Sequence, residues 1–197
     1  MNKIYNNLSI DNLMLTNWFN QFNEEQKEEI IKGLNKGIDV SWYAKKEFDW
    51  AQMEEIRKGL EINLDISIYA NLDFDEYQMR EIRLGLKNNL DVSIYANSDK
   101  YNNNQMGQIR EGLEDNLNVF IYAKDYFDWL QMFEIREGLF NNLNVSVYAK
   151  EQYDHKQMNQ IRLGLEKDLD ISVYAKPKYS WREMKEIREQ LLKESTL

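Results

Sequence analysis

The chain has 197 residues, enough for one domain of ordinary size. Its 34 acidic and 25 basic side chains give a net charge of −9, which disfavours nucleic acid as a partner through long-range repulsion. The chain has no cysteine and one histidine, which excludes disulfides, thiolate metal sites and paired-histidine metal sites. We therefore expect neither a metal ion nor another cofactor.

The start of the chain carries no apolar signal segment, and no run approaches the ~18 apolar residues of a membrane span. We therefore expect a cytoplasmic protein. Residues 9–22 predict an N-terminal helix, and we expect residues 1–22 to cap the array that follows.

A repeat of 26 or 27 residues fills positions 23–192, and residues 193–197 are left as a frayed tail. The dipeptide Gln-Met marks it at Gln52-Met53, Gln78-Met79, Gln105-Met106, Gln131-Met132 and Gln157-Met158. Such regular spacing indicates tandem structural units that pack on their neighbours. No linker interrupts the series, so residues 1–197 predict a single domain.

Each repeat first predicts a helix of about 13 residues. A capping residue stands three positions before a Gln or Glu, which is a capping box, and an aromatic residue before it pairs with a Met after it as a hydrophobic staple. A residue that tolerates the left-handed conformation follows the helix. The capping residues are Asp49, Asp75, Asn102, Asp128, Asp154 and Ser180, and the C-terminal residues are Gly37, Asn63, Asn89, Asn116, Asn142 and Asp168.

The second element of each repeat, residues 64–70 in one copy, has two interpretations. Asp65 can cap a short helix that places Ile66 and Tyr69 on one side. Alternation of Leu64, Ile66 and Ile68 instead fits a short strand, which would give an α/β solenoid. The recurring Asp or Asn at the cap position favours the helix. The sequence thus predicts an all-α solenoid of about six to seven units, each with one long and one short helix.

The motif Gln-Met-x-x-Ile-Arg-x-Gly-Leu-x-x-x-Leu-Asp-Val-Ser-x-Tyr-Ala resembles short repeats in an uncharacterised family of proteins from low-GC Gram-positive bacteria, their phages and mobile elements. The resemblance covers residues 23–192. It implies a helical-repeat array and carries no activity with it.

One arginine recurs in each full repeat, and it has two interpretations. A row of cations can follow the phosphates of a nucleic acid. Alternatively, each guanidinium group makes a structural bond to a cap such as Asp65 or to the last carbonyls of a neighbouring helix. We favour the structural ladder, because the arginine recurs whatever the other surface residues are. Its members are Arg57, Arg83, Arg110, Arg136, Arg162 and Arg188.

The glycine inside each long helix, Gly59 in one copy, predicts a close approach of the short element. The numerous carboxylates are typical of solvated helix faces and loops, and His155 is expected at the surface. No nucleophile, acid–base pair or ligand cluster stands out, so we expect the protein not to be an enzyme.

The unit over residues 124–145 differs from the others. Trp129, Phe133 and Phe140 form one outward stripe where an earlier unit carries Glu76, Arg80 and Lys87. Aromatic side chains of this kind predict a partner-binding surface, unless neighbouring units bury them. The candidate binding residues are Trp129, Leu130, Phe133, Phe140 and Tyr126, with Phe120 close by and Trp50 and Trp181 in the first turns of other units.

These observations favour a non-catalytic scaffold that binds a protein partner. A concrete version is an inhibitor of a host-defence nuclease, of anti-CRISPR or anti-restriction type, whose acidic surface mimics nucleic acid or fills a basic groove. The alternatives are a nucleic-acid-binding repeat protein that uses the arginine row, and a self-assembling structural protein or homodimer.

Overall fold

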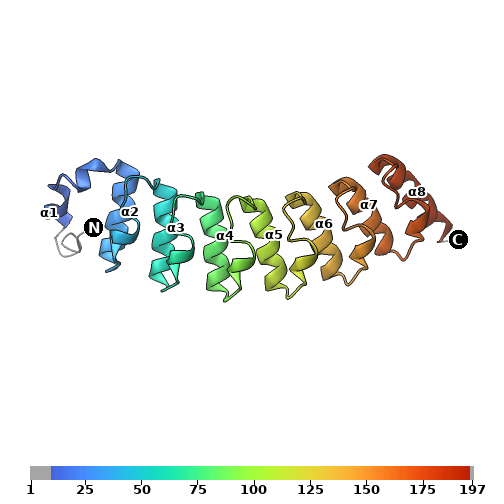
Figure 1. The fold of residues 1–197 in the computed structure, drawn as a ribbon, viewed down its shortest axis with the longest axis horizontal. Coiled ribbons are helices and arrows are strands. Elements are labelled where there is room, and N and C mark those ends of the chain that lie inside the picture. The colour runs from blue at the N-terminus through green and yellow to red at the C-terminus, as the bar shows by residue number, and fades with distance from the viewer. Residues whose placement is uncertain (1–9, 196–197) are drawn as a thin grey trace. The chain divides into compact units, whose positions relative to one another are not determined.

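The computed structural model describes residues 10–195, and all regular elements in that range are helical (Figure 1). Long α-helices alternate with 3-10 helices of three residues. The predicted all-α solenoid is confirmed, and the described residues contain no strand, so the α/β alternative is wrong. The long helices are α2 (Glu24–Asn35), α3 (Trp50–Glu61), α4 (Glu76–Lys87), α5 (Asn103–Glu114), α6 (Trp129–Phe140), α7 (His155–Leu165) and α8 (Trp181–Glu194).

The chain forms two compact units, Met1–Asn103 and Asn104–Leu197. In the first unit α2 packs on α3 and α3 on α4, and in the second unit α6 packs on α7 and α7 on α8. Each unit thus stacks consecutive long helices, as a repeat array requires. The expectation of one domain over residues 1–197 stays a prediction.

The N-terminal cap is not the continuous helix over residues 9–22 that the sequence predicts. The described part forms α1 (Ile10–Met14) and the 3-10 helix η2 (Phe19–Gln21). The Thr16 hydroxyl donates to the Leu13 carbonyl at 2.7 Å and accepts from the Phe19 amide at 3.1 Å, so this side chain ends one helix and starts the next. Residues 1–9 lie outside the described range, and α8 runs through residue 193, where the tail was expected to begin.

Capping boxes fix where the long helices begin. In α3 the Asp49 carboxylate accepts from the Gln52 amide at 2.8 Å, and the Gln52 side chain accepts from the Asp49 amide at 3.0 Å. The same reciprocal pair starts α2, α4, α6, α7 and α8, with caps Asn23, Asp75, Asp128, Asp154 and Ser180.

Left-handed residues then turn the chain out of each helix. Asn63 has φ 56°, and the Leu64 amide donates to the Gly59 carbonyl at 3.0 Å, which closes the helix end. Asn89, Asn116, Asn142, Asp168 and Gly37 also have positive φ, as predicted.

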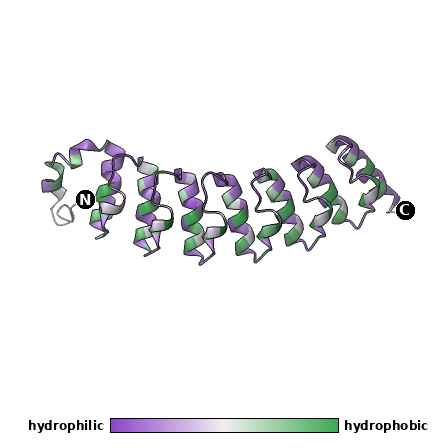
Figure 2. Ribbon diagram, viewed as in Figure 1, coloured by the Kyte–Doolittle hydropathy of each residue, from purple (hydrophilic) through white to green (hydrophobic). Residues whose placement is uncertain are grey.

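The core follows the stripe of Met and Ile residues along each long helix. Met53 and Ile56 are fully buried in α3, and so are their counterparts Met132 and Ile135 in α6. Figure 2 shows hydrophobic residues recurring along the long helices and hydrophilic residues at the turns. One face of every long helix is thus buried, and the opposite face is left for the surface.

The predicted short helix of each repeat is a 3-10 helix. These elements are η3 (Val40–Trp42), η4 (Ile66–Ile68), η5 (Val92–Ile94), η6 (Val119–Ile121), η7 (Val145–Val147) and η8 (Ile171–Val173). Asp65 caps η4 by accepting from the Ser67 amide at 3.1 Å. Tyr69 follows η4 and donates from its hydroxyl to the Glu55 carbonyl at 3.3 Å. A Cβ atom at Gly59 would come within 2.0 Å of that hydroxyl, so the predicted close approach is real.

Candidate functional site

The repeats differ from one another on the outward face of their long helices. We define this face by the first, second and fifth helical residues, and by the twelfth in the helices that reach it, which lie opposite the buried Met and Ile. The first three of these positions are Glu24, Glu25 and Glu28 in α2, Trp50, Ala51 and Glu54 in α3, and Glu76, Tyr77 and Arg80 in α4. In the second unit they are Trp129, Leu130 and Phe133 in α6, His155, Lys156 and Asn159 in α7, and Trp181, Arg182 and Lys185 in α8.

The outward face of α6 carries a line of aromatic side chains, Trp129, Phe133 and Phe140, which we call the α6 stripe. Trp129 is 39% exposed and Phe140 57% exposed, while Phe133 is half-buried. The Arg136 guanidinium lies 5.7 Å from the centre of the Phe133 ring. Because Trp129 and Phe140 are the first and last residues of α6, the stripe runs the whole length of the helix, roughly 16–18 Å. Leu130 lies beside it and is half-buried.

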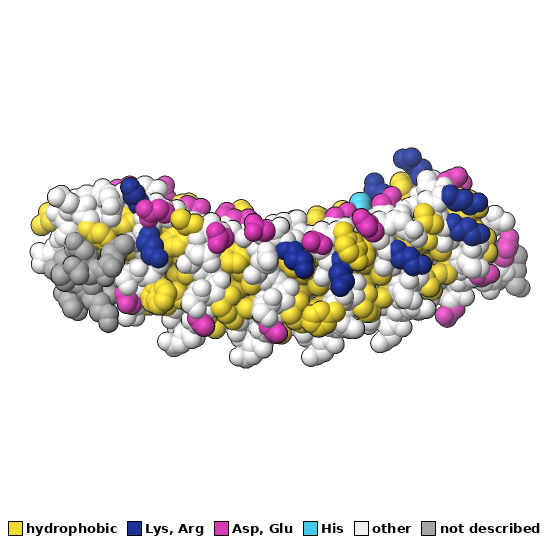
Figure 3. Space-filling view, viewed as in Figure 1, with side chains coloured by type: hydrophobic (Ala, Val, Ile, Leu, Met, Phe, Trp, Pro, Cys, Tyr) yellow, Lys and Arg dark blue, Asp and Glu magenta, His cyan; other side chains and the backbone are white. Residues whose placement is uncertain are grey.

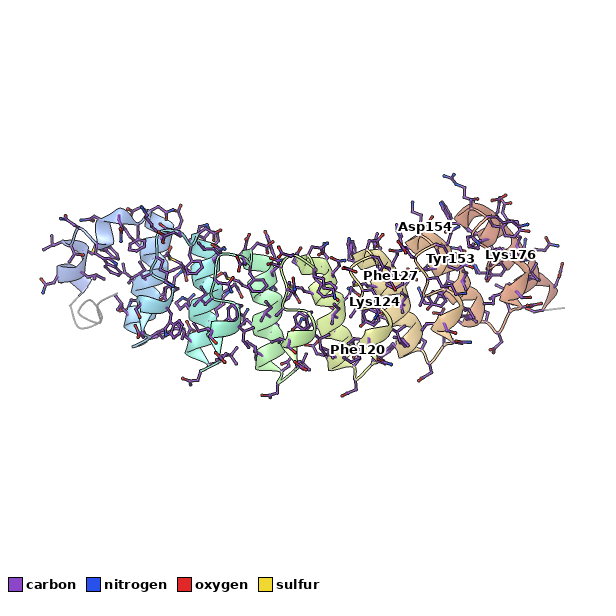
Figure 4. All side chains as sticks on the ribbon, in the orientation of Figure 1. Phe120, Lys124, Phe127, Tyr153, Asp154 and Lys176 are labelled. Atoms are coloured by element: carbon purple, nitrogen blue, oxygen red, sulfur yellow. The ribbon has the colours of Figure 1, made fainter. Side chains whose placement is uncertain are left out.

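Tyr126 and Phe120 precede α6 and are further exposed aromatic residues of the second unit. They are 51% and 63% exposed. The Tyr126 ring packs against Phe127 with 4.6 Å between ring centres. In Figure 4, Phe120 lies at the lower edge, whereas Lys124 and Phe127 lie at mid-height. Phe120 is thus at the edge where the long helices end, which is also the end of α6 that carries Phe140.

Trp50 belongs to the first unit and lines a separate groove. The groove lies between α3 and α4, has a volume of about 370 Å³, and includes Trp50, Ala51, Tyr77 and Arg80 among its lining residues. Trp50 is 48% exposed. The small side chain of Ala51 leaves room for this groove. The same position in α4, α6, α7 and α8 holds a larger side chain. The sequence analysis named Trp50 as a candidate binding residue but did not predict the groove. The small size of Ala51 is the feature of the sequence that could have indicated it.

Trp181 is surrounded by positive charge. It is half-buried, with the Lys156 ammonium 5.7 Å and the Arg182 guanidinium 5.0 Å from its ring. These are distances at which cation–π attraction operates. Trp181 is therefore the centre of a basic cluster rather than part of the α6 stripe.

The recurring arginines bond one long helix to the preceding one. The Nε atom of Arg57 donates to Glu29 at 2.8 Å, that of Arg162 to Glu134 at 2.8 Å, and that of Arg136 to the Gln108 side chain at 3.0 Å. Arg83 and Arg188 make the same contact with Glu55 and Gln160. The prediction that these arginines bond to Asp caps or helix-terminal carbonyls is thus wrong, because in these five contacts the acceptor is a side chain 28 residues earlier.

These arginine side chains are nearly buried, with 7–13% of their surface exposed. Burial alone would lower the pKa of Arg57, but its hydrogen bond to Glu29 and the charges of Glu29 and Glu61 raise the pKa overall. A row of exposed guanidinium groups, which phosphate tracking requires, is therefore not formed by this ladder.

The carboxylates on the inner sides of the helices are already engaged. Glu29, Glu55 and Glu134 are buried, and each accepts from an arginine of the next helix. His155 is half-buried as the first residue of α7. Within residues 10–195, no three His, Cys, Asp or Glu side chains are arranged to hold a metal ion. In the same range no helix combines the length and apolarity needed to cross a bilayer.

Comparisons with protein-family models, with curated proteins and with solved structures find no match for this chain. The resemblance of its repeats to those of phage and mobile-element proteins therefore stays a prediction.

Proposed function

We propose that the protein is a non-catalytic helical-repeat scaffold that binds a protein partner through the α6 stripe. The observation that carries the proposal is the exposure of Trp129 and Phe140 along one outward line of α6, with Phe133 between them. Exposed aromatic residues of this kind are typical of the energetic centre of protein interfaces.

The fold itself does not require aromatic residues at these positions. In α4 the matching positions hold Glu76, Arg80 and Lys87, and α4 still packs on α3 as α6 packs on α7. Keeping three large rings on an outward face increases the apolar surface in contact with water. Since folding does not require these rings, burial under a binding partner is the reason that we propose for their presence.

The first partner class to test is a nuclease of a host-defence system. The resemblance of the repeats to those of phage and mobile-element proteins supports this choice, and so does the net charge of −9. A nuclease presents a basic surface to its nucleic acid, and an acidic protein can be attracted to that surface. Nucleic acid itself is less favoured, because the ladder arginines bond to neighbouring helices.

The general proposal is tested by affinity capture from host lysate with three forms of the protein. The wild type is compared with Trp129→Glu/Phe140→Glu and with a control, Ile62→Glu/Ile68→Glu, which changes two exposed apolar residues of the first unit. We expect one partner to be retained by the wild type and the control and lost by the stripe variant. The purified partner should reproduce this order. Equal capture by all three forms would reject the stripe as the binding surface.

The nuclease version has its own test. Purified CRISPR and restriction nucleases are assayed for cleavage with a molar excess of each form. Inhibition by the wild type and the Ile62→Glu/Ile68→Glu control, with loss in the stripe variant, would support it. Full cleavage in the presence of the wild type would reject this partner class and leave the general proposal to the capture experiment.

A further inference from the structure

The starts of α7 and α8 carry a set of cations that no ion pair compensates in the described part of the chain. The set comprises Lys156, Lys176, Lys178 and Arg182, which we call the basic edge. All four side chains are exposed. In Figure 3, Lys and Arg side chains gather over α7 and α8. Figure 4 places Lys176 beside Tyr153, on the segment that leads into α8.

Two of these cations stand where a helix disfavours positive charge. Lys156 is the second residue of α7, and Arg182 is the second residue of α8. The first turn of a helix carries partial positive charge from its unpaired N–H groups, so a cation there opposes folding. These two positions are therefore unfavourable for a cation within the helix itself.

The acidic side chains at the same helix starts are used for capping. Asp154 accepts from the Gln157 amide at 2.8 Å. Glu183 accepts from the Ser180 amide at 2.7 Å, and this hydrogen bond lowers the pKa of its carboxyl. Four cations stand against these two carboxylates, so the basic edge keeps an excess of positive charge.

The Trp181 ring fixes part of this charge in place. Lys156 comes from α7 and Arg182 from α8, and both lie within cation–π distance of the ring. Lys178 lies similarly against Tyr179, 5.0 Å from its ring centre. A ring that already holds two cations offers less free face for stacking of a nucleic-acid base.

The first unit presents the opposite charge at the matching positions. Glu24, Glu25 and Glu28 occupy the first, second and fifth positions of α2, and we call them the acidic edge. Glu25 is exposed and has no ion pair in the described structure. Glu24 and Glu28 pair with Lys27 and Lys32, but these are exposed pairs along one helix, which are weak and readily exchanged.

We infer that the basic edge of one copy of this chain binds the acidic edge of a second copy. Lys156 and Arg182 occupy the same helix position as Glu25, the second, and the two edges carry opposite charges on exposed side chains. Each copy carries one edge of either sign, so the smallest assembly that this contact forms is a dimer. The contact uses the edges and not the α6 stripe, so it stands independently of the proposed function.

A charge-swap experiment tests the inference. Molar mass is measured by sedimentation equilibrium at low and high salt for the wild type, Lys156→Glu/Arg182→Glu, Glu25→Lys/Glu28→Lys and the four-fold combination. The control is Lys87→Glu/Lys167→Glu, which makes the same change in net charge at exposed lysines away from the edges. We expect dimers of the wild type whose dissociation constant rises about tenfold or more with added salt.

Each of the two double variants of an edge should be monomeric, and the control should be dimeric. The variant that combines all four substitutions should be dimeric again. Lys156→Glu/Arg182→Glu should also melt no lower than the wild type, since acidic residues suit a helix start. A monomeric wild type at high concentration and low salt overturns the inference. So does equal weakening by the control, or a four-fold variant that folds but stays monomeric. Binding of a fluorescent oligonucleotide by the wild type that Lys156→Glu/Arg182→Glu abolishes would assign the basic edge to nucleic acid instead.

Discussion

The hydroxyl group of Tyr148 lies so close to Gly138 that a Cβ atom added at that glycine would come within 1.9 Å of it. The same hydroxyl donates to the Glu134 carbonyl at 3.0 Å, one turn before the glycine in α6. Glycine in a helix interior costs ~1 kcal/mol relative to alanine. The tyrosine contact explains why that cost is tolerated, and it recurs at Gly33, Gly59, Gly85, Gly112 and Gly164.

Gly138→Ala should therefore destabilise the protein by about 1–3 kcal/mol, in spite of the better helix propensity of alanine. Tyr148→Phe added to it should recover part of the loss, because the clashing oxygen is removed. The free energy of unfolding is measured with urea. The control is Gln190→Ala in α8, at the matching position without a tyrosine after it, which should change stability by less than about 0.5 kcal/mol.

The arginine ladder predicts an asymmetric response at the α6–α7 contact. Arg162→Leu should cost about 3–5 kcal/mol, because it leaves the buried Glu134 carboxylate without its positively charged partner, with only the Asn159 amide still donating to it. Glu134→Gln should cost less than about 1 kcal/mol, since Gln160 accepts the equivalent bond from Arg188 at 3.0 Å. Urea unfolding of both variants and of the double variant measures the coupling. Equal losses in the two single variants would contradict this account.

Met106→Ala should empty a fully buried site in α5 and cost about 2–4 kcal/mol. In a repeat array the contacts are between neighbours, so the loss should be concentrated near the altered helix. Hydrogen exchange by mass spectrometry follows it along the chain. Faster exchange in α5 and α6 than in α8 is the expected pattern, and uniform acceleration would refute it.

Much of the fold could be predicted because it depends on short-range chemistry. Asp49 and Gln52 form a capping box whose members lie three residues apart, and Asn63 takes a left-handed conformation next to the helix that it ends. Residues this close together can be assigned from spacing alone. Because the pattern recurs about every 26 residues, an assignment that is correct for one repeat applies to the corresponding residues of the others.

Contacts between repeats were harder to predict. The Arg57 partner is Glu29, and identifying it requires the packing of α3 on α2. Gln52 also donates to the Phe74 carbonyl at 2.8 Å, which ties its repeat to the next and was missed because the capping box alone accounted for this residue. For the candidate site, outward positions were predictable from helical periodicity. The cations around Trp181 depend on two helices and were not.

Alkaline pH should destabilise the protein through its buried tyrosines. Burial raises the pKa of Tyr174 to about 12 from an ordinary value of 10.0, and it also raises the pKa values of Tyr43, Tyr69, Tyr122 and Tyr148. The unfolded chain then releases protons that the folded chain keeps. This contribution to stability is complete below pH 10 and is lost as the pH rises toward 12.

Urea unfolding measured at increasing pH checks this expectation, with tyrosinate absorbance followed in parallel. Tyr174→Phe should lower stability at neutral pH and reduce the loss at alkaline pH. A wild-type stability that stays constant across the range in which free tyrosine ionises would contradict it.

Phe133→Glu separates a binding role of the α6 stripe from a structural one. Position 133 matches Glu54 in α3, so a glutamate fits the repeat, and Arg136 lies beside it. We expect circular dichroism melting to change by only a few degrees while partner binding is lost, because the contact of the ring is removed and a charged group under a partner must be desolvated. Phe133→Leu, which keeps an apolar side chain, should retain most of the binding. Unfolding of the repeat by Phe133→Glu would show that this ring belongs to the core, and unchanged melting with unchanged binding would remove it from the binding surface.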